Sequence, residues 1–386
     1  MSPTDRALRI AVVAGEASGD RLGAGLIRSL RAGTLDVDVA GVAGPAMREA
    51  GCRPMLEASQ FAVMGLAEVV RHLPRLWMLR RRLLRQLAEF RPDIFIGVDS
   101  PELNLGLAGR LKRRGVRTVQ YVCPSIWAWR AGRVRRIRRN CDRVLCLLPF
   151  EPALLRKEGV EAVFVGHPIA DEQAPGRGGS LTAVREGQLL VALLPGSRGS
   201  EISRIGPPVA RAAAWLAARR PGVRFATAAA TPQGREQFAA ILKRFAPSVK
   251  VRQASGNARE LLKAADLAAA ASGTVTMEAM VCGCPLVVAY RVVPLTAWIA
   301  RAFRLLKTPY VALPNVLAGR KVVPELLQER ARGEALGAEL LSLYDDPGAR
   351  RAMRVEFARL SGSLRRGVDD RAAQAVLALA SRLARG

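Results

Sequence analysis

The stretch "IFIGVDSPELN", residues 94–104, decides the fold class. Its first five residues, Ile94–Val98, are apolar without alternation, as in a strand that is buried on both faces of a sheet. The run ends at Asp99, and the Ser-Pro pair that follows is typical of a helix start. Such a unit predicts a parallel sheet covered by helices. Asp99 either caps the helix or does chemistry, and the stretch alone leaves both interpretations open.

Short apolar runs and helical patterns alternate along the whole chain. Strands are expected at Arg9–Val13, Val37–Val42, Ile94–Val98, Arg117–Val122, Val144–Leu147 and Val163–Val165. After a polar segment they are expected at Leu189–Leu193, Arg224–Ala228, Val249–Arg252, Leu267–Ala270 and Leu286–Val288. The tail, 322–385, predicts successive helices with breaks near Pro347 and Gly362–Gly367. In sheets of this kind ligands bind beyond the carboxyl ends of the strands.

The length of 386 residues, half of them hydrophobic, exceeds one typical core and suits two domains. We therefore predict two Rossmann-like, doubly wound α/β domains that face a cleft, with a helical C-terminal tail. The expected parts are an N-terminal domain (1–169), a linker or loop (170–188), a C-terminal domain (189–360) and a final helix (361–386) that packs back on the first domain.

The composition argues against a metal centre and against a secreted protein. The six cysteines (52, 123, 141, 146, 282 and 284) form no Cys-x-x-Cys pair, and the chain has two histidines. Cysteines this scattered are typical of reduced thiols in a cytoplasmic protein. No signal peptide is visible. The weakly charged stretch Leu267–Tyr290 contains turns with Gly and Pro, so no transmembrane helix is expected.

The charge is strongly basic. Sixty Lys and Arg residues against 33 Asp and Glu give a formal net charge of +27. Such a charge attracts partners that carry phosphate, which include nucleic acid, anionic lipid and sugar phosphates. Composition does not choose between these partners.

Residues 61–91 combine an apolar stripe of helical spacing with many arginines. Pro74 predicts the start of a second helix within the segment. The stripe and its basic border include Leu73, Leu76, Trp77, Arg80 and Arg81. This amphipathic pair either packs on the sheet with a solvated basic face, or lies on an anionic membrane and receives an acyl chain.

A turn in the second half predicts a phosphate site. In "LLVALLPGSRGSEISR" (189–204) an apolar strand ends at Pro-Gly-Ser-Arg and a helix follows. Gly196 allows close backbone approach, Ser197 offers a hydroxyl, and Arg198 offers a fork for phosphate. A simple solvated turn is the alternative.

A second turn, in "AASGTVTMEAM" (270–280), places Ser272, Gly273 and Thr274 between a strand and a helix. Glu278 follows one turn later in an otherwise apolar helix, where a lone acidic residue is costly unless it is partnered or faces a cleft. A carboxylate there suits the two hydroxyls of a ribose. An ion pair with a nearby arginine is the alternative.

Three further stretches carry weaker signals. Ser18, Gly19 and Asp20 follow the first strand and either present amides to an anion or cap a helix. Trp127 and Trp129 precede a dense arginine run, which is typical either of a nucleic-acid surface or of a helix with a basic outer face. His167 follows a strand and is more typical of a hydrogen-bonding residue than of a catalyst.

Nine stretches resemble one family, lipid-A-disaccharide synthase, a glycosyltransferase of the two-domain GT-B type. They are "VAGEASGD", "GVDSPELN", "YVCPSIWAWR", "LPFE", "FVGHPIAD", "LLPGSRGSEI", "ASGTVTMEA", "CPLVVAYR" and "YVALPNVLAGRKVVPELLQ", in order from residue 13 to residue 328. Nine ordered motifs are specific where a single glycine loop is not. Cys123 departs from the pattern, because the family is expected to have serine there.

The resemblance implies a reaction. UDP-2,3-diacylglucosamine is the donor, 2,3-diacylglucosamine 1-phosphate is the acceptor, and the products are the β-1,6-linked disaccharide 1-phosphate of lipid A synthesis and UDP. It implies an inverting displacement with no metal and no cofactor. Asp99 would be the base that takes the proton of the acceptor 6-hydroxyl, and Glu16 would help the acceptor or orient the base.

The resemblance also implies a donor site and a location. The donor-site residues would be Gly196, Ser197, Arg198, Ser272, Gly273, Thr274, Glu278, Asn315 and Gln328. Because both substrates carry acyl chains, the N-terminal domain would hold the acceptor, and residues 61–91 would contact the membrane. The protein is expected to be cytoplasmic and peripherally associated with the inner membrane, with an oligomer left open.

Two alternatives remain at this level. A UDP-N-acetylglucosamine 2-epimerase shares the two-domain design but would not need residues 61–91. A basic nucleic-acid-binding protein would use the charge and the Trp and Arg residues. However, no RRM, KH, helix-turn-helix or zinc motif appears, so we expect no nucleic-acid partner.

Overall fold

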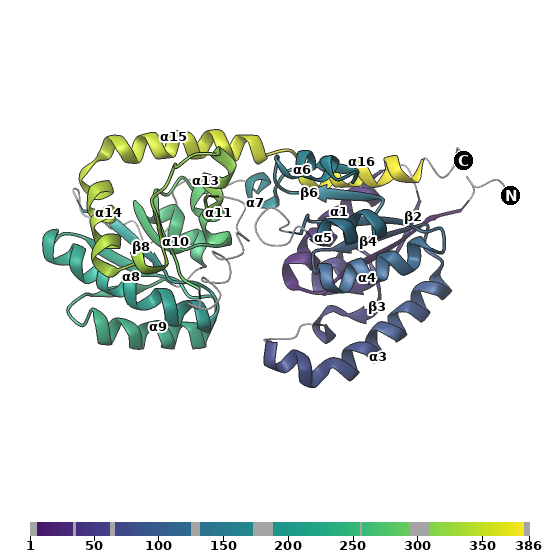
Figure 1. Cartoon of the computed structure of the whole chain (residues 1–386), viewed down its shortest axis with the longest axis horizontal. Coiled ribbons are helices and arrows are strands. Elements are labelled where there is room, and N and C mark those ends of the chain that lie inside the picture. The colour runs from purple at the N-terminus through teal and green to yellow at the C-terminus, as the bar shows by residue number, and fades with distance from the viewer. Residues whose placement is uncertain are drawn as a thin grey trace. The chain divides into compact units, whose positions relative to one another are not determined.

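The computed structural model describes residues 6–33, 36–61, 66–124, 132–172, 188–254, 257–292 and 309–381. The chain divides into two compact units. Unit 1 comprises residues 1–171 together with 364–386, and unit 2 comprises residues 172–363. Each unit is built on one parallel sheet covered by helices (Figure 1). Most of the expected linker, 170–188, lies outside the described residues.

The sheet of unit 1 has seven parallel strands in the order β3-β2-β1-β4-β5-β6-β7. They are β1 (Leu8–Ala14), β2 (Val37–Ala43), β3 (Arg53–Glu57), β4 (Ile94–Val98), β5 (Arg117–Tyr121), β6 (Arg143–Cys146) and β7 (Ala162–Phe164). All five residues of β4 are buried, as its unbroken apolar run predicts. The strand order reverses between β1 and β4, which makes this point the topological switch, where open α/β sheets bind ligands.

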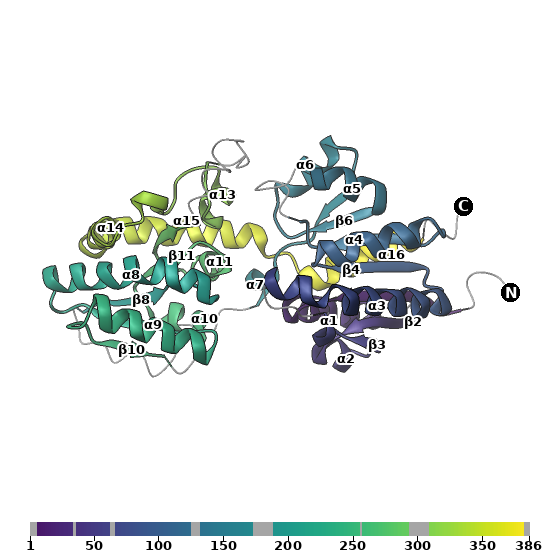
Figure 2. The same ribbon diagram turned by 60° about the horizontal axis from the view of Figure 1, so that its bottom comes forward.

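Helices cover both faces of this sheet (Figure 2). One face carries α1 (Ala17–Ala32), α2 (Pro45–Glu49) and α16 (Val368–Ala380). The other carries α3 (Leu66–Phe90), α4 (Pro101–Lys112), α5 (Gly132–Asn140) and α6 (Glu151–Lys157). The short helices η1 (Ala58–Gln60) and α7 (Pro168–Asp171) complete the unit. Because side chains alternate along each strand, both faces contribute an aliphatic core.

The last helix of the chain belongs to unit 1. The carboxylate of Asp171 accepts hydrogen bonds from the backbone N–H groups of Arg366 (2.8 Å), Gly367 (3.1 Å) and Val368 (2.5 Å) at the start of α16. The buried guanidinium of Arg143 on β6 donates to the carbonyl of Ala375 further along the helix. These polar bonds hold the apolar face of α16 on the core beside α1.

The sheet of unit 2 has six parallel strands in the order β10-β9-β8-β11-β12-β13. They are β8 (Leu190–Leu194), β9 (Arg224–Thr227), β10 (Val251–Gln253), β11 (Leu267–Ala271), β12 (Leu286–Tyr290) and β13 (Glu325–Leu327). The helices are α8 (Gly199–Arg219), α9 (Pro232–Phe245), α10 (Ala258–Ala264), α11 (Thr274–Val281), α13 (Leu313–Ala318), η2 (Gln328–Arg330), α14 (Gly333–Asp345) and α15 (Pro347–Leu364). The switch point of this sheet lies between β8 and β11.

Two glycines let α14 pack closely on α8. A Cβ atom on Gly333 would lie 2.4 Å from Cβ of Arg211, and one on Gly337 would lie 2.7 Å from Cε3 of Trp215. Neither contact is tolerable, so the sequence of α14 allows a helix approach that larger side chains would prevent.

Three expectations about secondary structure are wrong. Pro74 starts no second helix, because α3 is one helix of 25 residues. The hydrogen bonds of its other turns compensate for the one that proline removes. Strand β3 is missed because it is a largely exposed edge strand that contains Pro54. Strand β13 interrupts the tail expected to be helical from 322, and its three residues are too few for a recognisable period. Among the described residues, no helix is long and apolar enough to cross a membrane.

Candidate active site

The acidic residues expected to act on the acceptor lie at the switch point of unit 1. Ala14, the last residue of β1, pairs in register with Val98, the last residue of β4. Glu16 and Asp99 therefore follow neighbouring strands at the same edge of the sheet. Glu16 is exposed and is the N-cap residue of α1, without a side-chain capping bond.

The backbone at Asp99 is strained and is held by three hydrogen bonds. Asp99 and Ser100 have φ angles of +49° and +39°, in the left-handed region that non-glycine residues rarely adopt. The N–H of Asp99 donates to the carbonyl of Tyr121 (2.8 Å). Its own carbonyl accepts from Nδ2 of Asn104 (2.9 Å) and Nε2 of Gln120 (3.0 Å). Strain that the surroundings maintain in this way is characteristic of functional sites.

The capping alternative for Asp99 is not what the structure shows. The N-cap residue of α4 is Ser100, and it makes no side-chain capping bond. Within the described ranges, the carboxylate of Asp99 takes part in no hydrogen bond or ion pair. It is partly buried at the sheet edge and remains accessible to a ligand.

Asn104 and Gln120 hold the backbone of Asp99, and the sequence analysis missed both. Asn104 is fully buried, and its Nδ2 also lies 3.1 Å from the carbonyl of Val98 and 3.3 Å from that of Val13. A Cβ on Gly97 would lie 2.5 Å from Cβ of Asn104, so glycine is needed for this packing. The available signal was a polar residue on the otherwise apolar inner face of the helix that follows Asp99.

Asp20 has a structural role. It is 4 % exposed, and its carboxylate accepts from the backbone N–H groups of Gly44 (2.7 Å), Ala46 (2.9 Å) and Met47 (3.2 Å). The side chain thereby caps α2, as an acidic group at a helix N-terminus should. The expectation that Ser18 or Asp20 is the N-cap of its own helix is wrong, because Glu16 is the N-cap of α1 and Asp20 lies inside that helix.

In unit 2, the turn after β8 has an internal partner that the sequence analysis did not expect. Gly196 has φ +122°, and a Cβ there would lie 2.6 Å from Cβ of Glu201. The carboxylate of Glu201 accepts from the N–H groups of Ser197 (3.1 Å) and Arg198 (3.4 Å). The backbone amides of this turn are therefore bonded to a side chain in the first turn of α8. The guanidinium of Arg198 is 3.3 Å from Glu201, and 81 % of the side chain is exposed.

The second turn of unit 2 lies beside the first. Leu194 of β8 pairs in register with Ala270 of β11, so residues 195–198 and 272–274 follow adjacent strands. Oγ of Ser272 donates to the carbonyl of Val311 (2.8 Å), while a Cβ on Gly273 would meet nothing within 4 Å. Thr274 is exposed at the start of α11, and Glu278 is partly buried one turn later. The two turns flank the switch point of unit 2.

Asn315 and Gln328 differ in the hydrogen bonds that their side chains make. Asn315 is fully buried, and its amide bonds to Val322, Val323 and Glu325. Both polar atoms of the Asn315 side chain bond to the segment that leads into β13. The side chain therefore holds that backbone in place and presents no polar atom to a ligand. Gln328 has φ +50° at the carboxyl end of β13. Its Oε1 accepts from the N–H of Val292 (3.4 Å), so it links the ends of β12 and β13.

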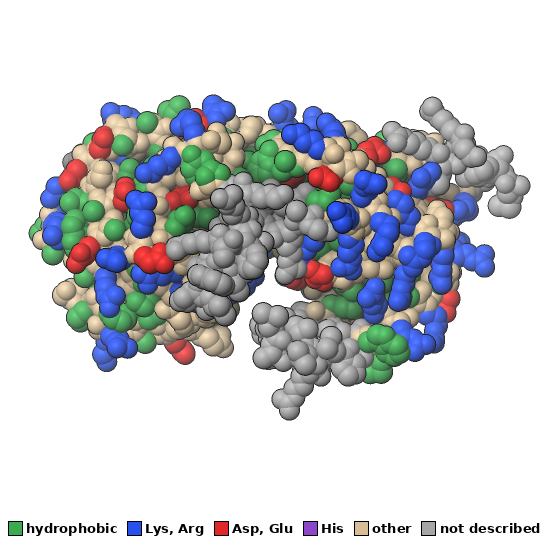
Figure 3. All heavy atoms as spheres, viewed as in Figure 1, with side chains coloured by type: hydrophobic (Ala, Val, Ile, Leu, Met, Phe, Trp, Pro, Cys, Tyr) green, Lys and Arg blue, Asp and Glu red, His purple; other side chains and the backbone are tan. Residues whose placement is uncertain are grey.

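The residues expected to face a membrane lie on α3. The side chains of Leu73 and Leu76 lie outside the described part of the structure. Trp77 is 58 % exposed, and the guanidinium of Arg81 stands 4.6 Å from the centre of its ring. Arg80 is partly buried, and burial, followed by the nearness of Arg110 and Arg136, lowers its pKa. Figure 3 shows Lys and Arg side chains gathered on unit 1.

His167 is a capping residue. Its Nδ1 accepts from the N–H of Ile169 (3.3 Å) in the first turn of α7. Burial lowers its pKa to about 4, so the ring is neutral at physiological pH. This agrees with the interpretation as a hydrogen-bonding residue. Trp127 and Trp129 lie outside the described residues.

Two cysteines lie together despite their distant positions in sequence. Cys123 follows β5 and Cys146 ends the neighbouring strand β6, and Glu151 begins α6. The two Sγ atoms and a carboxylate oxygen lie within 4.8 Å of one another, close enough to hold a metal ion. Local spacing had indicated no such group, because sequence spacing does not reveal which residues neighbouring strands bring together.

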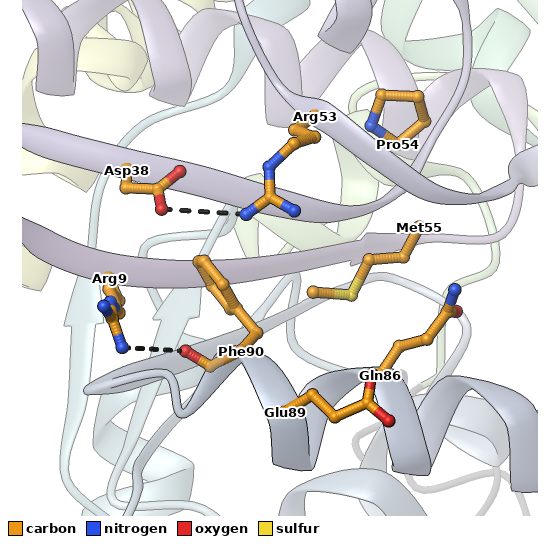
Figure 4. A pocket seen from close by; sticks show the side chains of 8 residues that line it. All are labelled: Arg9, Asp38, Arg53, Pro54, Met55, Gln86, Glu89 and Phe90. Carbon is orange, nitrogen blue, oxygen red and sulfur yellow. Dashed lines mark hydrogen bonds and ion pairs between the residues drawn. The ribbon is translucent and has the colours of Figure 1, made fainter.

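A pocket of about 390 Å³ lies at the opposite edge of the unit 1 sheet (Figure 4). Its lining comes from the amino ends of β1, β2 and β3 and from the last turns of α3. Arg53 lies 3.7 Å from Asp38 and stands over the ring of Phe90. The pocket is therefore separate from the polar residues at the switch point.

Two Rossmann-like units, each with polar turns at its switch point, define the GT-B class of enzymes. The fold resembles a putative UDP-N-acetylglucosamine 2-epimerase from Listeria monocytogenes (TM-score 0.62, 14 % identity, 99 % of this chain and 98 % of that one). It also resembles the kitacinnamycin glycotransferase (TM-score 0.59, 17 % identity, 96 % and 98 %). At these identities the likeness shows the fold alone.

The sequence identifies the family within this class. The model of the lipid-A-disaccharide synthetase family matches residues 10–379. The lipid-A-disaccharide synthase of Sodalis glossinidius is 46 % identical over 98 % of this chain and 99 % of that protein. That of Azotobacter vinelandii is 46 % identical over 97 % and 99 %. The chain belongs to the lipid-A-disaccharide synthase family of glycosyltransferases, and the epimerase alternative is a neighbour in fold only.

Proposed function

We propose that the protein transfers the diacylglucosaminyl group of UDP-2,3-diacylglucosamine to the 6-hydroxyl of 2,3-diacylglucosamine 1-phosphate. The products are the β-1,6-linked tetraacyl disaccharide 1-phosphate and UDP. The observation that carries this proposal is the carboxylate of Asp99, which stands without a protein partner among the described residues, on a strained backbone at the switch point of unit 1.

Asp99 is the general base of the proposed reaction. As the acceptor oxygen attacks the anomeric carbon, its proton passes to the Asp99 carboxylate, and the bond from that carbon to the diphosphate breaks. A single displacement of this kind inverts an α-linked donor to a β-linked product. The hydrogen bonds from Asn104 and Gln120 to the Asp99 carbonyl support fixed placement of the base, which general base catalysis requires. Glu16, on the neighbouring strand end, is placed to help the acceptor.

The donor binds through the turns of unit 2 in this proposal. Arg198 supplies the positive charge for the departing diphosphate, and its high exposure and weak hold by Glu201 support that role. A bound diphosphate competes with Glu201 for the guanidinium and for the amides of Ser197 and Arg198. Glu278 accepts the ribose hydroxyls beside the open turn at Gly273. We propose no metal in this chemistry, because guanidinium donors serve the leaving group.

Membrane contact is a further part of the proposal. Both substrates carry acyl chains that reside in a bilayer. The exposed Trp77 and Met78 on α3, with Arg81 beside them, support peripheral attachment of unit 1 to an anionic surface. This attachment would bring the acylated substrates to the enzyme without a membrane-spanning helix.

The experiment that tests the function supplies both diacylated sugars in mixed micelles and follows UDP release and disaccharide formation. We expect equimolar products that require both substrates, with turnover unchanged by EDTA. A parallel reaction contains UDP-N-acetylglucosamine alone and is examined for the 2-epimer. Epimer formation, or UDP release without the acceptor, would contradict the transferase, and loss of turnover in EDTA would contradict the metal-free mechanism.

A further inference from the structure

Two buried thiols and a buried carboxylate form a compact donor set in unit 1. Cys123, Cys146 and Glu151 are 5 %, 0 % and 3 % exposed. Two sulfur atoms and one carboxylate oxygen lie within 4.8 Å of one another. In the part of the chain that the structure describes, this is the one group of three or more His, Cys, Asp or Glu ligand atoms so close together. The proposed glycosyl transfer uses none of these residues.

The fold holds these donors in place. Strands β5 and β6 are neighbours, and the N–H of Val122 donates to the carbonyl of Leu145 (3.0 Å). Val122 has φ +75°, a left-handed conformation that a β-branched residue rarely adopts, immediately before Cys123. The N–H of Leu148 donates to the Glu151 carboxylate (3.1 Å). The donor set is therefore assembled by backbone structure on three elements.

The surroundings of Cys123 favour its protonated form. Hydrogen bonding of the Cys123 thiol to Cys146, and then burial, raise the pKa of Cys123 well above its usual range. A metal ion reverses this preference, because its charge favours thiolates. The Cys123 thiol is thus a group whose state a bound cation would change.

We propose that Cys123, Cys146 and Glu151 bind a thiophilic divalent cation of the Zn²⁺ and Cd²⁺ class. Tetrahedral Zn²⁺ takes sulfur at about 2.3 Å and carboxylate oxygen at about 2.0–2.2 Å, which places two sulfur ligands roughly 3.8 Å apart. The present limit of 4.8 Å on the spacing of the three donors lies within about 1 Å of that distance. Binding releases two thiol protons and leaves a fourth position for water. Hard cations such as Mg²⁺ do not suit thiolates.

The site is linked to the proposed base by one side chain. Nε2 of Gln120 donates to the carbonyl of Asp99 (3.0 Å) and lies 3.4 Å from the carbonyl of Val122, the residue before Cys123. A cation on Cys123 is therefore connected to the backbone that holds Asp99. The cation itself touches no proposed substrate group, so the site is separate from the transfer chemistry, which we expect to continue in EDTA.

The test titrates the reduced full-length protein with Cd²⁺ and measures sulfur-to-cadmium charge-transfer absorption. Cys282 and Cys284, separated by one glycine, are a second pair of thiols and serve as the matched control. We expect the Cys282→Ser/Cys284→Ser protein to keep the absorption at one cation per chain. Adding Cys123→Ser or Cys146→Ser should abolish it, and adding Glu151→Gln should keep the absorption but lower the affinity.

Circular dichroism establishes whether each variant is folded. If the Cys123 and Cys146 variants do not fold, X-ray absorption of the Zn²⁺-loaded Cys282→Ser/Cys284→Ser protein decides, because Cys123 and Cys146 are the two thiols that the described structure brings together with a carboxylate. Two sulfur ligands and lighter ligands are expected. Absence of binding, absorption that survives Cys123→Ser, or a zinc ion without two sulfur ligands would overturn the proposal.

Discussion

At the scale of the residue, three of the five left-handed non-glycine residues in the described chain lie where we place the transfer chemistry. Asp99 and Ser100 are both left-handed at the end of β4, and Gln328 is left-handed at the end of β13. Each lies at the carboxyl edge of its sheet. Strain of roughly 1–3 kcal/mol at a residue persists only where the surroundings enforce it, and here Asn104 and Gln120 do so.

The Asp99→Asn variant tests the base. Asparagine tolerates a left-handed backbone, so the substitution should leave folding intact while it removes the proton acceptor. We expect turnover to fall about 10²- to 10⁴-fold with UDP affinity unchanged. Rates measured with saturating diacylated substrates, together with calorimetric UDP binding, check this. Turnover near that of the wild type would remove Asp99 from the role of base.

The Arg198→Ala variant tests the diphosphate site. Loss of a charged hydrogen-bond donor of about 1.5–3 kcal/mol should lower kcat/KM about 10- to 150-fold. UDP binding should weaken as well, because the diphosphate is common to both. Arg244→Ala, an exposed arginine in the last turn of α9, is the matched control and should change neither. Equal donor kinetics in the two variants would exclude Arg198 from the site.

At the scale of the element, the short helix α7 connects larger parts of unit 1 through hydrogen bonds at both of its ends. Helix α7 is four residues long, yet His167 caps its start and Asp171 at its end caps α16. The His167 cap depends on a protonation state, since a neutral imidazole nitrogen accepts the hydrogen bond. The hold of this element is therefore sensitive to acid.

The pH dependence of unfolding tests the His167 cap. Its folded pKa of about 4 lies below the ordinary value of 6.5, so the unfolded chain binds the extra proton first as the pH falls. The stabilisation is complete above pH 6.5 and is lost as the pH falls toward 4. Between pH 7.5 and 5 we expect a loss of about 2 kcal/mol in the free energy of unfolding.

The control for that measurement is His167→Asn, which keeps an acceptor for the N–H of Ile169 and does not titrate. Urea unfolding at both pH values should show a smaller acid loss for the variant, by about the same 2 kcal/mol. Identical acid losses in the two proteins would mean that His167 titrates normally in the folded state.

At the scale of the whole molecule, charge and exposed apolar side chains should act together in binding a membrane. Leu73→Ser, Leu76→Ser and Trp77→Ser in one variant should lower partitioning to anionic vesicles about tenfold or more. Val355→Ser, which alters a 71 % exposed apolar residue on α15, is the control and should leave partitioning unchanged. Added salt should weaken what remains, because the basic contribution is screened.

Sedimentation with vesicles of anionic phospholipid measures this partitioning. Neutral vesicles form the second arm and should bind less of every variant. Full sedimentation of the triple variant, at the same lipid concentration as the wild type, would show that α3 is not the attachment site.

The sequence predicts those features that depend on local burial and misses those that depend on pairing. Strand β4 begins and ends where its apolar run does, because a strand covered on both faces needs an unbroken run. The short edge strand β3 has no such requirement. The Glu201 carboxylate meets the amides of residues 197–198 because the first turn of α8 brings it there. Cys123 meets Cys146 because β5 and β6 are neighbouring strands. The separation of three and four residues allows the Glu201 contact without specifying it, whereas no spacing along the chain brings Cys123 to Cys146.

The return of α16 to unit 1 has a consequence for how the protein is made. The ribosome completes residues 1–171 long before it reaches residue 364, and all of unit 2 is synthesised in between. During that interval the nascent unit 1 lacks the helix that packs beside α1, and an apolar face stays bare. Unit 1 is the first unit to be synthesised and the last to be completed. The exposed apolar face therefore makes the nascent chain prone to aggregate with other chains until translation ends.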